Sequence, residues 1–488
     1  MTASSSFDVV ILGAGPAGSV LAEQLSRKGY RVALVDRQKF PRYAIGETLP
    51  ASVALLLKRA EVVPPDFVLA GAPTTGNLSA WGSGRVAFYP HTSDQAGRGF
   101  QVERAKFDAQ LLAAARSAGV TVIEGWRPEE FDHADSGWQV DLCSPEGARR
   151  RLRTSFVCDA SGRARVLARR LRLPQQKTRG LQLGLISYWR ATQPRDDADG
   201  FNPLVESIPD GWFYTARLNS SQRVAGFMTD RSLLPSNVRR TAPQIYLRAL
   251  EHARHAKRRL RGFSWDGEVR VFPAYPSLVE RCCGPGWLLV GDAASTLDPL
   301  CSQGVQKAIA SALTAATAVH TLLVHPQRCA WVMEFCHERE HAGFLSHLAA
   351  RSNYYGREQR FAEQPFWKQR AAPETPPPSR DPAAGRRQAS LRNQDRITMG
   401  PDVQLQQRPV IEGAFVELRP AVVSPQAGRG VRYCGDLCVP DLMGLLSDRP
   451  ALEVLLSRYQ SLHPTISAAS FSRGIAGLQE MRLLQRAG

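Results

Sequence analysis

The stretch FDVVILGAGPAGSVLAEQLSRKGYRVALVD, residues 7–36, decides the fold of this chain. Its apolar run Val9–Leu12 leads into the glycine turn Gly13–Gly18, a helical pattern follows, and a second apolar run, Val32–Val35, ends at Asp36. In such a βαβ unit the first glycine permits the tight turn, the second lets a pyrophosphate approach the backbone, and the third lets the helix pack on the strand. The helix N-terminus attracts phosphate, and an acid at the end of the second strand accepts hydrogen bonds from a ribose. The stretch therefore predicts a nucleotide-binding unit.

Two further apolar strands end in turns that contain glycine. The run Arg151–Cys158 leads into DASGR, residues 159–163, and the run Trp287–Val290 leads into Gly291 and Asp292. Ligands of open α/β sheets lie at the carboxyl ends of strands, so these turns belong near the first one. The loop Pro299–Gly304 then opens an alanine-rich helix, whose N-terminus is expected to face the same ligand.

The loop Arg37–Pro50 runs from the second strand into a predicted helix, residues 51–59, and carries Arg42 and Glu47 close to the nucleotide. A second helix is predicted over 109–118, after Arg104. Short β-like runs between 181 and 230 predict an antiparallel sheet, which is a natural substrate wall. Near the C-terminus, residues 416–423 and 430–434 read as a hairpin, followed by helices at 442–446, 451–462 and 471–484. That pattern resembles a winged-helix module; a lid without a separate role is the alternative.

At 488 residues the chain is too long for a single core. We expect an α/β nucleotide-binding domain with an inserted antiparallel β-sheet domain and a small α+β C-terminal domain. The predicted limits are 1–80, 101–172 and 270–370 for the nucleotide-binding domain, 81–100 and 173–269 for the substrate domain, 371–387 for a proline-rich linker and 388–488 for the C-terminal domain.

The chain is basic, with 62 Lys and Arg against 45 Asp and Glu and a net charge of +17. This excess favours an acidic partner or an anionic cofactor. Nucleic-acid binding is disfavoured, because the arginine clusters lack interleaved aromatic residues. The nine cysteines are scattered without paired CxxC motifs, which indicates a reducing, cytoplasmic setting and no metal site. We expect neither a signal peptide nor a membrane span.

The glycine turn, DASGR and GDAASTLDPLCSQG (291–304) together resemble the class A flavoprotein monooxygenases, of the para-hydroxybenzoate hydroxylase fold, over residues 7–370. The resemblance implies a Rossmann-like domain that binds FAD. It assigns the ADP half of FAD to the glycine turn and Asp36, the pyrophosphate to DASGR, and the ribityl chain to Asp292. The implied FAD-binding residues are Gly13, Gly15, Ala17, Gly18, Asp36, Arg37, Arg42, Glu47, Arg104, Asp159, Asp292 and Gly304.

Within this superfamily, GETLP (46–50) and Phe366-Trp367 look like the branch of flavin-dependent halogenases and geranylgeranyl reductases. Halogenases carry a lysine on the segment corresponding to 71–84, and this segment has none; their WxWxIP signature is also missing from residues 211–217. Halogenation is therefore disfavoured. The chain most resembles the flavoprotein monooxygenases of tryptophylquinone biogenesis, which act on a tryptophan of a partner polypeptide. A polypeptide or small acidic protein is thus the expected substrate.

The resemblance also implies a reaction. FAD, reduced by NAD(P)H or by a partner flavin reductase, gives with O2 a C4a-hydroperoxide that an electron-rich ring attacks. Trp81, Trp212 and Tyr214 are the candidate wall residues for this ring, and no catalytic residue is assigned. Two alternatives stay open: a hydroxylase, reductase or halogenase for a small molecule, and a non-catalytic, flavin-stabilised scaffold that binds a peptide.

Overall fold

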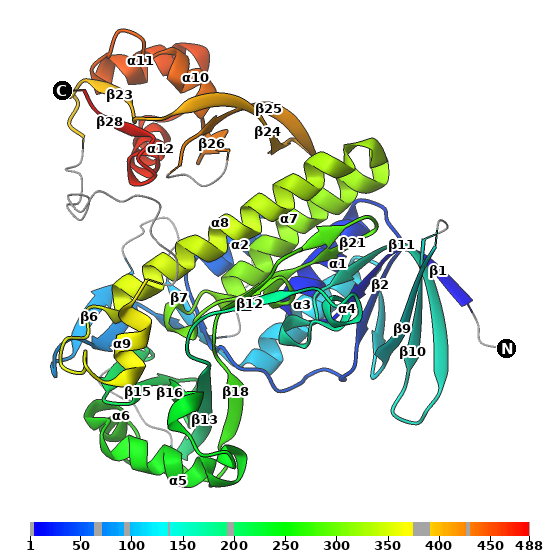
Figure 1. The fold of residues 1–488 in the computed structure, drawn as a ribbon, viewed down its shortest axis with the longest axis vertical. Coiled ribbons are helices and arrows are strands. Elements are labelled where there is room, and N and C mark those ends of the chain that lie inside the picture. Colours follow the sequence, from blue (N-terminus) through cyan, green and yellow to red (C-terminus); the bar gives the residue numbers. More distant parts are fainter. Residues whose placement is uncertain are drawn as a thin grey trace. The chain divides into compact units, whose positions relative to one another are not determined.

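The computed structural model describes residues 4–62, 71–91, 98–134, 137–191, 193, 200–373, 391–425 and 430–487. Contacts divide the chain into two compact units: Met1–Ala316 with Phe344–Glu374, and Thr317–Gly343 with Thr375–Gly488 (Figure 1). Most of the predicted linker, 371–387, lies outside the described residues.

A mainly parallel sheet forms the centre of the first unit, with the strand order β20-β21-β11-β1-β2-β8, in which β20 runs antiparallel to β21. Strand β1 pairs in parallel with both β2 and β11, so that Val9 lies opposite Val32 and Phe156. All five residues of β2 are buried, as expected for a central strand covered on both faces. The bounds are β1 (Ser4–Leu12), β2 (Val32–Asp36), β8 (Thr121–Glu124), β11 (Arg149–Asp159), β20 (Cys283–Gly284) and β21 (Trp287–Leu289).

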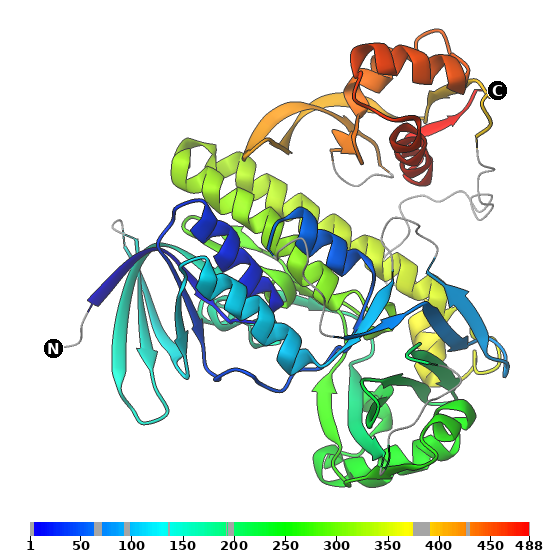
Figure 2. The same ribbon diagram turned by 180° about the vertical axis from the view of Figure 1, so that it is seen from behind.

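Helices and an antiparallel hairpin complete this domain. Helices α1 (Pro16–Arg27) and α3 (Arg104–Ser117) lie side by side on the sheet (Figure 2). Helix α3 begins five residues earlier than predicted, so Arg104 lies in its first turn. The predicted α/β fold with a Rossmann-like unit is confirmed. The other elements of this domain are the helices α2 (Ser52–Arg59) and α4 (Val166–Arg170) and the hairpin of β9 (Arg127–Ala134) and β10 (Gly137–Cys143). One small sheet is formed by β3 (Thr48–Leu49), β4 (Gly71–Thr74) and β7 (Gly99–Val102). A second small sheet is formed by β12 (Gln175–Lys177), β19 (Ser277–Val279) and β22 (Ser295–Thr296).

The second sheet of this unit is mainly antiparallel, in the order β17-β13-β16-β15-β14-β5-β6, with β18 also paired to β13. It takes in residues 76–80 and 270–273, just outside the limits predicted for the substrate domain. Because side chains alternate along a strand, Trp212 and Tyr214 face one side and Phe213 the other. The bounds are β5 (Gly76–Ala80), β6 (Ala87–Pro90), β13 (Gln182–Ala191), β14 (Leu204–Ile208), β15 (Gly211–Arg217), β16 (Gln222–Asp230), β17 (Phe263–Trp265) and β18 (Arg270–Pro273).

Two helices cover the outer face of this sheet. Phe213, Phe227 and Leu185 of the sheet pack there against Tyr246 and Leu250. These residues belong to a core formed with helices α5 (Val238–Glu251) and α6 (Arg254–Arg259). The inner face forms a separate aromatic core with the end of helix α8 (Cys329–Tyr355) and with α9 (Pro365–Ala371).

Helix α7 (Gly304–Val324) is 21 residues long and has the length and composition of a membrane-crossing helix. The described residues contain one such helix, which the sequence predicted as an alanine-rich helix but not as a candidate membrane span. A buried core helix passes the same test, so this feature by itself is weak evidence for a membrane span. Ile309, Ala312, Ala316 and Val319 are fully or almost fully buried, and 39% of the apolar window is buried as a whole.

The second unit holds the C-terminal residues together with residues 317–343 of helices α7 and α8. The backbone N–H of Val416 donates to Thr321, and Arg408 pairs with Glu334 and Glu338. The domain limit predicted at 388 leaves these helix segments out. The C-terminal helices are α10 (Val439–Gly444), α11 (Leu452–Leu462) and α12 (Ala468–Glu480), and the short strand pairs are β23 (Ile397–Met399) with β28 (Leu484–Arg486) and β26 (Tyr433–Cys434) with β27 (Leu437–Cys438).

The C-terminal hairpin differs from the prediction. It pairs β24 (Gln404–Glu412) with β25 (Phe415–Val423), whereas the sequence predicted a pairing of 416–423 with 430–434. Residue 431 forms only an isolated bridge to Val422. The turn needs Gly413, whose φ is +56°. The winged-helix likeness stays a prediction.

Candidate functional site

A cavity of about 450 Å³ opens where the carboxyl ends of the parallel strands meet the inner face of the antiparallel sheet. Both walls carry residues predicted from the sequence. The predicted residues on its lining are Gly13, Gly15, Ala17, Asp36, Arg42, Glu47, Arg104, Asp292, Gly304, Trp212 and Tyr214. The structure thus brings together residues that lie up to nearly 300 positions apart in the sequence. Gly18, Arg37, Asp159 and Trp81 do not line this cavity.

The glycine turn is as tight as its sequence predicts. Gly13 has a φ of +100°, and a Cβ there would lie 2.5 Å from the carbonyl oxygen of Ala160. A Cβ on Gly18 would lie 1.8 Å from the carbonyl oxygen of Gly13. Gly18 therefore acts from beneath the turn, by letting α1 approach β1. Asp36 holds the turn from the other side, because its carboxylate accepts from the backbone N–H of Ala14 at 2.8 Å.

Three other predicted residues lie away from the cavity. Asp159 is fully buried and accepts from the backbone N–H groups of Ser161 and Leu167, so it shapes the DASGR turn from below. Arg37 is exposed. Trp81 packs behind Trp212, with ring centroids 6.4 Å apart. We infer that Asp159 and Trp81 support the cavity wall rather than contact a ligand.

Arg42 and Arg104 bring positive charge to the wall of the cavity. Arg104 forms a bidentate ion pair with the fully buried Asp108, at 3.0 and 3.1 Å. Burial acts to lower the pKa of Arg104, but this ion pair raises it above its usual value. The Nε–H of Arg42 is buried without a hydrogen-bond partner among the described residues. A buried donor of this kind, beside a glycine turn, fits the phosphates of FAD.

Glu47 lies on the boundary between this cavity and a smaller one of about 250 Å³. Its carboxylate accepts from the Tyr188 hydroxyl and from the backbone N–H of Gly46. Burial raises the pKa of Glu47, and these hydrogen bonds act in the opposite direction. The smaller cavity shares Arg104 and Ile186 with the larger one, and its wall includes Tyr43, which is 37% exposed.

Asp292 and Arg163 face each other across the cavity wall, with the Nε of Arg163 3.9 Å from a carboxylate oxygen. The Asp292 side chain is 37% exposed, so its oxygens are open to hydroxyl groups of a ligand. Burial lowers the pKa of Arg163. The first turn of α7 completes this wall with Gly304, where a Cβ would meet nothing within 4 Å. The helix N-terminus is therefore accessible to a ligand with partial negative charge.

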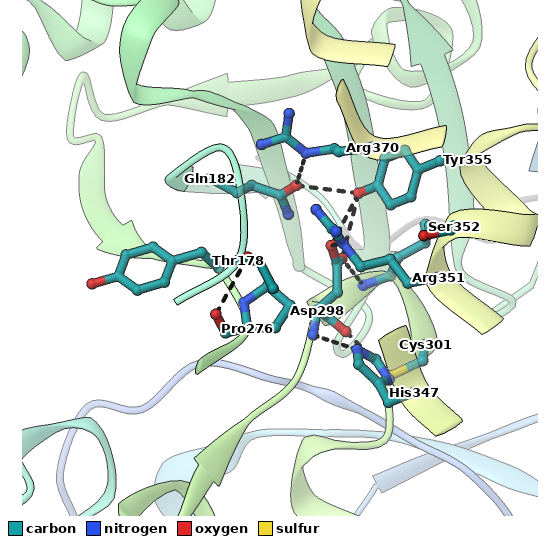
Figure 3. Close-up of polar contacts among 12 residues, drawn as sticks. Thr178, Gln182, Pro276, Asp298, Cys301, His347, Arg351, Ser352, Tyr355 and Arg370 are labelled. Atoms are coloured by element: carbon teal, nitrogen blue, oxygen red, sulfur yellow. Dashed lines mark hydrogen bonds and ion pairs between the residues drawn. The ribbon is translucent and has the colours of Figure 1, made fainter. Parts of the chain in front are cut away.

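Sequence reasoning missed a buried polar network behind this wall, which Figure 3 shows. Asp298 is 1% exposed and lines the cavity. Its carboxylate accepts from the Nε of Arg351 at 2.9 Å and from the backbone N–H of Leu300 at 3.1 Å, while its own backbone N–H donates to the Nε2 of His347 at 2.9 Å. The Cys301 thiol donates to the backbone carbonyl oxygen of Asp298. Asp298 thus fixes the loop that leads into α7.

The network continues to the aromatic wall. The indole N–H of Trp212 donates to the Tyr355 hydroxyl at 2.9 Å, and that hydroxyl lies 3.2 Å from the carboxylate of Asp298. It also lies 3.1 Å from the side-chain oxygen of Gln182, which accepts from Arg370 (Figure 3). The loop before α7 and the candidate ring-binding wall are therefore joined by two hydrogen bonds.

His347 makes this network sensitive to acid. Burial lowers the pKa of His347 below its ordinary 6.5, and its Nε2 must stay unprotonated to accept from Asp298. Below pH 6.5 the unfolded chain binds a proton that the folded chain excludes, so stability falls as the pH falls. We expect His347→Gln to reduce the loss of melting temperature between neutral pH and pH ~5.5. His252→Gln, at an exposed position, is the control. If the melting temperature changed equally with pH in the wild type and both variants, this role of His347 would be contradicted.

Comparison with known proteins identifies the fold family. The model of the FAD binding domain matches residues 6–328. The chain belongs to the FAD binding domain family. A relative, the tryptophan 2-halogenase of Chondromyces crocatus, is 31% identical over 375 residues, which cover 73% of this chain and 69% of that protein. The predicted resemblance to the class A flavoprotein monooxygenases is confirmed at the level of the family. The protein is an FAD-dependent oxidoreductase.

Two solved structures match this FAD binding domain protein over 98% of its chain. The peptidyl tryptophan dihydroxylase QhpG, essential for tryptophylquinone cofactor biogenesis, aligns with a TM-score of 0.68 at 25% identity over 99% of that chain. The flavin-dependent halogenase CmlS aligns with a TM-score of 0.80 at 21% identity over 96% of that chain, which shows the fold alone. Halogenases and a peptidyl tryptophan dihydroxylase are thus both among the proteins that this chain resembles.

Proposed function

We propose that this protein is an FAD-dependent monooxygenase that hydroxylates a tryptophan side chain of a partner polypeptide during biogenesis of a quinone cofactor. The observation that carries the proposal is one cavity with two kinds of wall. One wall has the glycine turn and the arginines suited to FAD, and the other has the apolar and aromatic side chains of an antiparallel sheet. The likeness to a peptidyl tryptophan dihydroxylase over nearly the whole chain supports a polypeptide substrate.

The cofactor, when bound and reduced, supplies the activation of O2. The chain has to hold the substrate ring against it and keep water out. Ile186, Val224 and Met228 give the inner wall its apolar surface, and Trp212 is locked in place by Tyr355. NAD(P)H or a partner flavin reductase is the proposed source of electrons, and the cytoplasm is the proposed location.

Halogenation of an aromatic substrate is the second candidate function, because the tryptophan 2-halogenase relative favours it. Against it, the lining of the cavity contains no lysine among the described residues, and residues 71–84 contain none either. A halogenase of the resembling type uses a lysine to receive hypohalous acid. We therefore rank oxygen insertion first.

The test offers the reduced, FAD-loaded protein a tryptophan-containing polypeptide with isotopically labelled O2 and an excess of chloride and bromide. Mass spectrometry of the polypeptide then separates the candidates. We expect labelled oxygen on tryptophan and no halogen. Incorporation of halogen would favour the second candidate, and an unchanged polypeptide would contradict a polypeptide substrate.

A further inference from the structure

Helices α5 and α6 carry a concentration of positive charge that the candidate site does not use. Residues 239–261 contain eight Lys and Arg and one acidic residue, Glu251. Seven of the eight are exposed, and we call them the basic helix face: Arg239, Arg240, Arg248, Arg254, Lys257, Arg258 and Arg261. These 23 residues therefore hold a large part of the net charge of +17 of the whole chain.

Most of these like charges have no ion-pair partner among the described residues. Lys257 pairs with Glu251. Arg239, Arg240, Arg248, Arg254 and Arg258 form no ion pair with any carboxylate of the described residues. Arg254, Lys257 and Arg258 follow at helical spacing along one side of α6, where like-charge neighbours destabilise a helix. Such a face favours the binding of a partner with negative charge.

The basic helix face is rigidly anchored. Glu206 of β14, 5% exposed, accepts from the backbone N–H groups of His255 and Ala256 and so fixes the start of α6 on the sheet. The apolar side of α5 packs on the same sheet through Tyr246, which is fully buried. The exposed charges are thus presented on a preformed surface, which lowers the entropic cost of binding.

The basic helix face is also close in sequence to residues that line the smaller cavity. Helix α6 leads into β17, whose residue Trp265 pairs with Trp189 of β13. The next residue of β13, Arg190, lines the smaller cavity together with Asp266, which follows β17. That cavity shares Glu47 and Arg104 with the larger cavity. Arg261 of the basic helix face is thus five residues along the chain from Asp266 of this cavity wall.

We propose that the basic helix face docks an acidic segment of the polypeptide substrate, which rests on the proposed function. An acidic polypeptide fits better than a nucleic acid, because single-stranded nucleic acids are bound by aromatic side chains interleaved with basic ones. Here the aromatic residue of α5, Tyr246, is buried in the core, and the one large apolar side chain exposed on the described part of α5 and α6 is Leu247.

The test measures binding of fluorescein-labelled decaglutamate to the full-length, FAD-loaded protein, with a neutral decapeptide and a single-stranded oligothymidylate as the other probes. The patch variant is Arg254→Glu/Lys257→Glu/Arg258→Glu. The matched control is Arg153→Glu/Arg169→Glu/Arg170→Glu, which makes the same change in net charge at exposed positions outside the face. Melting temperatures establish that both variants are folded.

We expect decaglutamate to bind the wild type in a salt-dependent manner. The patch variant should lose about tenfold or more in affinity, and the control variant less than about twofold. Equal losses in the two variants would show a mere effect of net charge and overturn the proposal. Tighter binding of oligothymidylate than of decaglutamate through the face would also overturn it. Because binding needs no turnover, docking without oxygen insertion would refute the proposed function and leave the docking inference standing.

Discussion

Gly18→Ala is expected to give a protein that purifies without FAD. The added Cβ would lie 1.8 Å from the carbonyl oxygen of Gly13, a backbone atom that cannot move without opening the turn. Either α1 moves away from β1 or the turn loses the shape that admits a pyrophosphate. Overpacking of this kind costs about 1–3 kcal/mol of the free energy of unfolding. Flavin absorbance of the purified variant and its denaturant unfolding curve measure the two effects.

Gly343→Ala is the matched control, because it also replaces a helical glycine but has open space around the added Cβ. In a helix interior this change is expected to stabilise by about 0.5–1 kcal/mol and to leave the flavin content unchanged. A Gly18→Ala protein that retains stoichiometric FAD and wild-type stability would contradict the role given to the turn.

Asp298→Ala is expected to have the second large effect. It removes the carboxylate that Arg351 contacts at 2.9 Å and leaves a guanidinium that is 4% exposed without this partner. Removing one partner of a buried ion pair costs about 3–5 kcal/mol. It also releases the loop before α7, so we expect turnover to fall by at least about a hundredfold in the fraction of protein that stays folded. Denaturant unfolding and steady-state oxygen uptake give the two values.

Tyr355→Phe separates the contribution of the loop from that of the aromatic wall. It removes the hydroxyl that accepts from Trp212, while the ion pair of Asp298 with Arg351 remains. The expected cost is about 1–2 kcal/mol. If Asp298→Ala proved no more destabilising than Tyr355→Phe, Asp298 would not be the centre of the network.

The part of the site that lies on the βαβ unit was predictable, because its signals are local. Apolar runs, three glycines and a terminal acid occur within 30 residues, and the strands β1 and β2 occur where these runs predict them. The carboxyl ends of β11 and β21 followed from the same pattern, since parallel strands deliver their loops to one edge. These three turns do line one cavity, as expected from their place in the sheet.

The Asp298 network was not predictable from one sequence. Its partners, His347, Arg351 and Tyr355, come from a helix about 50 residues further along the chain. From the sequence alone, polar residues on such a helix are expected to face solvent. Only the tertiary structure shows that these side chains are buried. The roles of Asp159 and Trp81 were obscured for the same reason: sequence places a residue next to a site but does not say to which side its side chain turns.

The C-terminal hairpin shows a different reason for a wrong prediction. Strand β24 begins with three glutamines among its first four residues, 404–407, and contains Pro409, and both features argue against a strand. A proline is nevertheless acceptable in a two-stranded ribbon, where each strand has an unpaired edge. The apolar residues of 430–434 therefore seemed the better partner for 416–423, although they belong to the core of the C-terminal unit.

The central claim is that one cavity holds FAD between the parallel sheet and the aromatic wall. Titration of the flavin-depleted full-length protein with FAD, followed by flavin fluorescence and absorbance, tests it most directly. The structure predicts saturation at one FAD per chain, with quenching of the flavin fluorescence by the enclosing aromatic wall. A protein that takes up no FAD under conditions in which it is folded would contradict the claim.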